Sequence, residues 1–163
     1  LIDGATREVL LQFLSYSAAG RDGTPYTVID NALRRAAQRG VSVKLIVADW
    51  EKATPAERQL KDLAAVRNIG VRYSVIPPWS GGYVSYGRVE HCKYIVADGN
   101  RFWLGTSNCE KSYFHTSRNI GVICENETLV ARLHHIFKKG WDGPYVEPVL
   151  PDRVYAPRKH GGE

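Results

Sequence analysis

The sequence contains no methionine, and other absences narrow what the chain can be. No apolar run reaches the roughly 20 residues that a membrane-spanning helix needs, and the 163 residues contain no signal-peptide pattern. We therefore expect neither a membrane span nor a secretory leader within this chain. The missing Met and the abrupt start predict a processed piece, a cut form, or the ordered half of a longer protein.

Cysteine is also scarce, with only Cys92, Cys109 and Cys124. An odd number leaves at least one thiol unpaired within the chain, and the spacing matches no common zinc pattern. We predict no metal site and expect all three to be small buried side chains, which leaves the redox compartment open. Asn126 begins a glycosylation sequon, but it also suits the N-cap of a helix, the interpretation favoured here.

The composition fits a single compact domain with one core. The chain has 163 residues, of which 44% are hydrophobic, and the 22 Lys and Arg against 17 Asp and Glu give a net charge of +5. This excess favours a phosphate-bearing partner only mildly, since many soluble domains reach it without one. We place the domain at residues 1–146 and an irregular, Pro-rich tail at 147–163.

Strand-like and helix-like segments alternate along the chain. Apolar runs predict strands, and apolar residues at helical spacing after capping residues predict helices. The predicted strands are residues 9–15, 41–48, 71–76, 91–97, 101–106 and 118–124, and the predicted helices are 24–39, 54–68 and 126–140. This alternation predicts an α/β fold with a mixed, largely parallel sheet.

One segment gathers residues suited to phosphoryl chemistry. On a strand, His91 and Lys93 would point to the same face, because side chains alternate with period two. The hairpin signal at residues 98–100 would then bring Thr106 and Asn108 back to the same end of the sheet. A neutral imidazole can attack phosphorus, while an ammonium and amide donors can stabilise the charge that develops on the phosphoryl oxygens.

The spacing of these residues resembles the signature of the phospholipase D superfamily. That signature is His-x-Lys, four residues, Asp, six residues, then Gly-[Ser/Thr]-x-Asn, and the chain matches it throughout. The matching residues are His91, Lys93, Asp98, Gly105, Thr106 and Asn108. Longer stretches resemble the C-terminal half of the lysosomal phospholipase-D-like branch, over roughly residues 7–146.

The resemblance implies an α-β-α sandwich and a reaction without metal or cofactor. It implies two such motifs that face each other, one histidine becoming a phosphohistidine and the other protonating the leaving group. His91 is the single histidine here with Lys at plus two. The second half would come from a homodimer or from an N-terminal half of the same protein. Asn119 stands where many members carry an acidic residue that can orient a histidine.

The remaining residues of interest each have a structural alternative. Asp98 sits where a hairpin turn favours Asp, so it is either structural or a support for the site. Trp79, Tyr83 and Tyr86 either cover the edge of the core, the interpretation favoured here, or stack on a base or contact a lipid headgroup. Arg88 is either a phosphate contact or a surface salt-bridge member.

Three functions follow from these observations. The favoured one is a phosphodiesterase acting on single-stranded nucleic acid ends, as the resemblance to an exonuclease-like branch implies. The second is a phospholipase D or transphosphatidylase with a phospholipid substrate. The third is a half that is inactive without its N-terminal partner half. The resemblance alone favours a lumenal or extracytoplasmic location, such as the lysosome.

Overall fold

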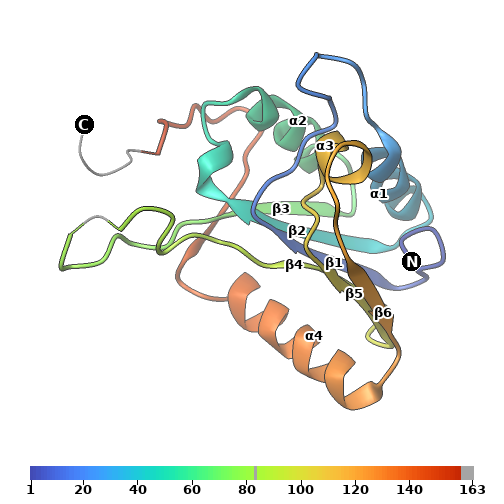
Figure 1. The fold of residues 1–163 in the computed structure, drawn as a ribbon. Helices are drawn as coiled ribbons and strands as arrows, with labels where there is room; N and C mark the ends of the chain where they lie inside the picture. Colours follow the sequence, from blue (N-terminus) through green and yellow to red (C-terminus); the bar gives the residue numbers. More distant parts are fainter. Residues whose placement is uncertain (83, 159–163) are drawn as a thin grey trace.

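The computed structural model describes residues 1–82 and 84–158 and places seven strands of this part in one sheet, ordered β6-β5-β4-β1-β2-β3-β7 (Figure 1). The strands are β1 (Glu8–Phe13), β2 (Ser42–Ala48), β3 (Ile69–Ser74), β4 (Lys93–Ala97), β5 (Arg101–Gly105), β6 (Gly121–Cys124) and β7 (Val146–Pro148). The helices are α1 (Val28–Gln38), α2 (Pro55–Ala64), α3 (Lys111–His115) and α4 (Glu127–Trp141), and a 3-10 turn, η1, spans Asp49–Glu51. Within the described residues, none of the helices has the length and apolar character to cross a membrane.

The sheet is mixed, as predicted, but it is not largely parallel. Only β1 with β2 and β2 with β3 pair in parallel. The pairs β1-β4, β4-β5, β5-β6 and β3-β7 are antiparallel. The reason is connectivity: helices join the first three strands, whereas a short hairpin joins β4 to β5 and can only produce antiparallel neighbours.

Helices cover both faces of the sheet, which confirms the α-β-α sandwich (Figure 1). Leu11 and Leu45 point to the face that α1 and α2 cover, where they join the larger core cluster. Leu10 and Ile46 point to the opposite face and pack with the apolar side of α4. Adjacent residues of one strand therefore serve different cores, which explains why β1 and β2 are apolar without alternation.

Local signals set several boundaries. Thr54 caps α2 and accepts a hydrogen bond from the Ala56 N–H, and Asn126 caps α4 by accepting one from the Leu129 N–H. The β4-β5 turn forms as predicted, with positive φ at Asp98 (53°) and Gly99 (65°). Helix α1 begins at Val28, later than predicted, and the stretch before it belongs to a loop.

The C-terminal tail is more ordered than predicted. Strand β7 crosses the boundary expected after residue 146 and pairs with β3. Beyond it Val149 and Tyr155 are buried in the larger core cluster. Apolar side chains spaced among prolines are therefore enough to attach this segment to the domain. Residues 159–163 lie outside the described part of the chain.

The three thiols are free, and of the three only Cys109 is buried as predicted. Cys109 is buried and Cys124 is half-buried, but Cys92 is exposed. Cys92 precedes β4 and lies beside His91, outside the sheet that would cover it. Burial of part of its side chain and the nearby Glu90 carboxylate raise the pKa of the Cys92 thiol to about 12, so this exposed thiol stays protonated at neutral pH.

Candidate functional site

Four of the predicted residues, His91, Lys93, Thr106 and Asn108, gather at the edge of the sheet where the parallel strands end. Phe13, the last residue of β1, pairs with Lys93, the first residue of β4. Strand β5 runs antiparallel to β4 and ends at Gly105, so it delivers Thr106 and Asn108 toward the same edge. Ligands of open α/β sheets bind at the carboxyl ends of the parallel strands, and this is that edge.

His91 and Lys93 lie at this edge, but not both on a strand. Strand β4 begins at Lys93, so the alternation that predicted a shared face does not extend to His91. The His91 side chain is exposed, whereas Lys93 is only 8% exposed. The Lys93 ammonium donates a hydrogen bond to the His91 carbonyl at 3.1 Å, which ties the two residues together through the backbone.

The partly buried position of Lys93 suits its ammonium to binding an anion. Burial lowers the pKa of Lys93, and the neighbouring Cys92 and Glu90 oppose this effect. A partly desolvated ammonium interacts more strongly with an anion than one in bulk water does. The arrangement can therefore bind and stabilise an oxyanion placed beside it.

A buried polar network, which sequence reasoning missed, holds the segment around His91. The Glu90 carboxylate accepts hydrogen bonds from the Gln12 amide at 2.7 Å and from the Cys92 N–H at 3.1 Å. The Gln12 side chain in turn accepts one from the Tyr94 hydroxyl. A signal existed, because Gln12 is a polar residue inside an apolar strand, and buried polar groups require partners.

Asn108 is fixed beside the end of β1 and is only 1% exposed. Its side-chain amide donates to the Tyr113 hydroxyl of α3 at 3.0 Å. The next residue, Cys109, donates its N–H to the Ser15 carbonyl at 3.3 Å and accepts from the Ser17 N–H at 2.8 Å. Among the described residues, the Asn108 side-chain oxygen has no hydrogen-bond partner.

Thr106 and Asn119 form a pair on the exposed side of this edge. The Thr106 hydroxyl donates to the Asn119 side-chain oxygen at 2.9 Å. The Asn119 amide donates to the Tyr113 carbonyl at 2.8 Å and to the Ser117 hydroxyl at 3.0 Å. Asn119 therefore connects the end of β5 to α3, the helix whose Tyr113 hydroxyl also accepts the hydrogen bond from Asn108.

Asp98 lies away from this edge, at the opposite end of β4. Its carboxylate accepts hydrogen bonds from the backbone N–H groups of Thr6, Arg7 and Glu8 at 2.8–3.0 Å. Burial alone would raise the pKa of Asp98, but these bonds lower it to about 2. Of the two roles considered for Asp98, its position assigns the structural one, which is to fasten the start of β1 to the β4-β5 turn.

The aromatic loop between β3 and β4 does not cover the core. Trp79 is 53% exposed and Tyr86 is 79% exposed, so the favoured prediction for these two was wrong. Tyr83 lies outside the described residues. Arg88 is exposed, and its guanidinium donates to the Pro77 carbonyl at 2.6 Å, closing the loop on itself. The loop borders a cavity of about 390 Å³.

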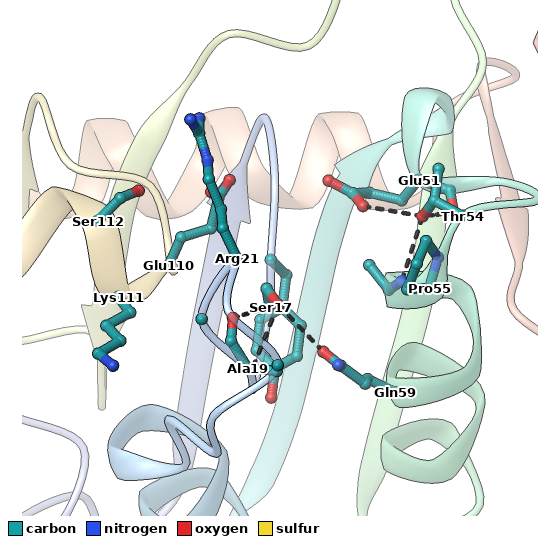
Figure 2. A pocket seen from close by; sticks show the side chains of 14 residues that line it. Ser17, Ala19, Arg21, Glu51, Thr54, Pro55, Gln59, Glu110, Lys111 and Ser112 are labelled. Carbon is teal, nitrogen blue, oxygen red and sulfur yellow. Dashed lines mark hydrogen bonds between the residues drawn. The ribbon is translucent and has the colours of Figure 1, made fainter.

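A second cavity, of about 430 Å³, lies between the segment after β1, the start of α2 and the start of α3. Figure 2 shows Glu51 and Glu110 on opposite walls of it. Glu110 accepts a hydrogen bond from the Ser15 hydroxyl. Burial, and to a smaller extent the Glu110 charge, raise the pKa of Glu51 to about 7. Sequence reasoning did not find this pair, because the two carboxylates lie 59 positions apart along the chain.

Known proteins resemble the chain over most of its length. Residues 1–141 match the family described as cardiolipin synthase, PLD-like domain. Over 154 residues the chain is 34% identical to phospholipase D Z of Dictyostelium discoideum, which covers 91% of this chain and 36% of that protein. Over 160 residues it is 32% identical to the 5'-3' exonuclease PLD3 of Bos taurus, covering 89% and 32%. The chain thus spans about a third of the length of these relatives.

Solved structures share the fold. NucT from Helicobacter pylori superposes with a TM-score of 0.74 at 18% identity, covering 90% of this chain and 85% of that one. Nuc from Salmonella typhimurium, described as a phospholipase D family member, superposes with a TM-score of 0.66 at 22% identity, covering 90% and 84%. Both matches span most of each chain, so the sandwich seen here is the fold of these two proteins.

Proposed function

The chain belongs to the phospholipase-D-like domain family, and from this premise we propose that it carries half of a phosphodiesterase site that transfers a phosphoryl group through His91, preferentially on single-stranded nucleic acid ends. The observation that carries the proposal is that the side chain of His91 is exposed at the carboxyl edge of the sheet, while the nearly buried Lys93 bonds the His91 carbonyl through its ammonium. An exposed nucleophile can reach a phosphorus atom, while the fixed charge receives the phosphoryl oxygens.

The proposed reaction has two steps. The neutral His91 imidazole attacks phosphorus, a nitrogen–phosphorus bond forms, and the bond from phosphorus to the leaving oxygen breaks. A second histidine gives the leaving oxygen its proton. Water then attacks the phosphohistidine, loses a proton to that second histidine, and frees His91. Lys93 and the Asn108 amide stabilise the phosphoryl oxygens in both steps, and no proposed step uses a metal or cofactor.

The second histidine has to come from another half, either a second copy of this chain or an N-terminal half of the same protein. One feature that supports a partner half is the exposed apolar surface of the edge strand β6 and its approach. Ile120 is 72% exposed, Val122 53% and Ile123 65%, on a strand whose outer edge pairs with no other described strand. An open apolar edge of this kind favours pairing with another chain or domain.

The oligomeric state of the isolated chain distinguishes the two sources. A homodimer predicts a mass of twice 18.3 kDa by analytical ultracentrifugation, and replacing Ile123 by Asp should return it to a monomer. A monomeric chain that gains activity on mixing with an N-terminal half carrying its own His-x-Lys motif would support the second source. A monomer that is fully active alone would contradict the half-site proposal.

The substrate class is the finer part of the proposal. Relatives carry the names phospholipase D and 5'-3' exonuclease, so lipid phosphodiesters are the alternative substrate. The test is to replace His91 by Ala in the complete protein and to measure hydrolysis of a single-stranded oligonucleotide and of phosphatidylcholine. We expect oligonucleotide hydrolysis to dominate in the unaltered protein and to be lost in the variant.

A matched control is His135→Ala, an exposed histidine on α4 that should leave turnover unchanged. Unaltered turnover on both substrates in the His91 variant would contradict the catalytic proposal. Dominant hydrolysis of phosphatidylcholine in the unaltered protein would instead favour the lipid alternative.

A further inference from the structure

The cavity beneath the aromatic loop has the make-up of a nucleobase site. It is bordered by three aromatic residues, Trp50, Trp79 and Tyr86, and by two guanidinium groups, Arg88 and Arg158. These residues come from three separate segments: the turn η1 after β2, the loop between β3 and β4, and the C-terminal tail. Its volume of about 390 Å³ lies within the range of small-molecule sites, roughly 300–1,000 Å³.

The rings of Trp79 and Tyr86 are exposed where they border the cavity and are not packed into the core. The Trp50 ring centroid lies 6.0 Å from that of Tyr86, with the planes tilted by 59°, and the Arg158 guanidinium lies 5.8 Å from the Trp50 centroid. Trp79 lies against the backbone of Gly81, where a Cβ would come within 2.4 Å of its ring. Rings held in place at one side and open at the other are suited to stacking.

The backbone of the loop is held in an unfavourable conformation. Tyr86 and Arg88 have positive φ angles of 55° and 53°, which non-glycine residues seldom adopt. Hydrogen bonds maintain this conformation: Arg88 donates to the Pro77 carbonyl at 2.6 Å, and Arg158 donates to the Arg88 carbonyl at 3.2 Å. Strained backbone kept by specific bonds is concentrated at ligand sites.

The charges in the cavity select among ligands. Asp49 is only 5% exposed, and its carboxylate is already engaged by Arg158 at 2.6 Å. Because the charges of Asp49 and Arg158 compensate each other, the Arg88 guanidinium makes the rim of the cavity positive. A quaternary ammonium headgroup would meet aromatic rings but also this cation, whereas a nucleotide offers a base to the rings and a phosphate to the guanidinium.

We propose that this cavity binds a nucleobase next to the scissile phosphate, by stacking against Trp79 and Tyr86 while Arg88 contacts the adjoining phosphate. Its location supports this, because the loop runs directly into the proposed catalytic segment and Arg88 precedes His91 by three positions. The inference rests on the proposed function and specifies its substrate as single-stranded nucleic acid.

The test measures binding separately from catalysis. The complete protein with His91 replaced by Ala is titrated with a short oligothymidylate and with the same oligonucleotide made abasic at its terminal positions, and tryptophan fluorescence is followed. We expect the abasic oligonucleotide to bind more weakly, by roughly 5- to 100-fold for a lost stacked base. When Trp79→Ala and Tyr86→Ala are added, the affinity for the normal oligonucleotide should fall to that measured for the abasic one.

Ring-retaining variants serve as matched controls. Trp79→Phe and Tyr86→Phe keep a stacking surface and should preserve most of the affinity. Rings that only shape the loop would instead make the alanine variants weaken the normal and the abasic oligonucleotide equally. In the protein that retains His91, the alanine variants should raise KM for the oligonucleotide by a larger factor than they lower kcat, because the stacked base contributes to binding and lies outside the reacting atoms.

Failure of this inference and failure of the proposed function are distinguishable. Equal affinity for normal and abasic oligonucleotides would overturn the nucleobase site, even if His91→Ala abolishes catalysis. Conversely, base-dependent binding that requires Trp79 would support the site even if no hydrolysis were found. Binding of phosphatidylcholine vesicles that depends on Trp79 and Tyr86, without oligonucleotide binding, would also overturn it.

Discussion

The side-chain amide of Asn108 donates a 3.0 Å hydrogen bond to the hydroxyl of Tyr113, and this bond joins the end of the His-x-Lys motif to helix α3. The bond fixes one side of a nearly inaccessible amide at the edge where His91 lies. Tyr113 thereby orients Asn108 without itself belonging to the motif. The side-chain oxygen of Asn108 has no hydrogen-bond partner among the described residues.

Replacing Tyr113 by Phe should therefore affect activity more than stability. The variant removes one hydrogen bond, worth about 1 kcal/mol, and leaves the ring in place. We expect urea denaturation to show a loss of about that size, while kcat falls several-fold because Asn108 is no longer held in one orientation. The control is Phe114→Leu on the same helix, which should leave kcat unchanged. Equal kcat in the Tyr113 variant and the unaltered protein would show that this bond does not position the site.

The burial of Lys93 predicts the alkaline limit of activity. Its pKa is lowered by burial, so the ammonium is lost at a lower pH than the usual 10.5. Because the proposed reaction needs the charged form, kcat/KM should fall as pH rises through this lowered pKa. Lys93→Met should abolish activity at all pH values. A kcat/KM that stays constant up to pH 10.5 would contradict the burial argument, whereas Lys44→Met on β2 should leave the profile unchanged.

Asp98 should matter for stability and not directly for chemistry. Its pKa of about 2 lies below the ordinary 3.8, so its stabilising contribution is present above about pH 3.8 and is lost as pH falls toward 2. Replacing Asp98 by Ala leaves three backbone N–H groups without their acceptor and should cost roughly 2–4 kcal/mol at pH 7. Thermal melts from pH 2 to 7 would measure this: the difference between variant and unaltered protein should shrink below pH 4. A difference that is the same at pH 2 and pH 7 would contradict it.

Glu51 predicts the opposite dependence on pH. Its folded-state pKa of about 7 lies above the ordinary 4.5. Between these two pH values the unfolded chain ionises Glu51 more readily than the folded protein does, so the free energy of unfolding should decline as pH rises from 4.5 through 7. Glu51→Gln should remove this decline and stabilise the protein at pH 8 by roughly 1–3 kcal/mol, with little effect at pH 4. Denaturation curves at the two pH values test it, with the exposed Glu125→Gln as control. An equal effect at pH 4 and pH 8 would exclude titration of Glu51 as the cause.

Much of the framework was predictable because it depends on local signals. Thr54 and Asn126 begin helices since their side chains accept hydrogen bonds from the free N–H groups of the first turn. The Asp98-Gly99 pair forms the turn that its backbone preferences favour. The order and type of the main elements followed from such signals, whereas the family followed from the spacing of the motif that begins at His91.

The site was predictable in its members but not in their relative roles. The spacing of His91, Lys93 and Asn108 identified them, yet that spacing also included Asp98, which the fold places at the far end of β4. The prediction that Trp79 and Tyr86 cover the core was wrong, because a Pro-rich aromatic loop does not reveal by composition which side of its rings meets the protein.

By itself the sequence determined the α/β class, the starts of α2 and α4, the hairpin and the motif, because each is encoded by residues that are neighbours or share a short period. Only the tertiary structure decided the antiparallel pairing of β1 with β4, of β5 with β6 and of β3 with β7. It also decided the attachment of the tail, and the encounters of Glu51 with Glu110 and of Trp50 with Tyr86. These depend on contacts between distant parts of the chain, whose free energies are set by packing, burial and desolvation in the assembled fold.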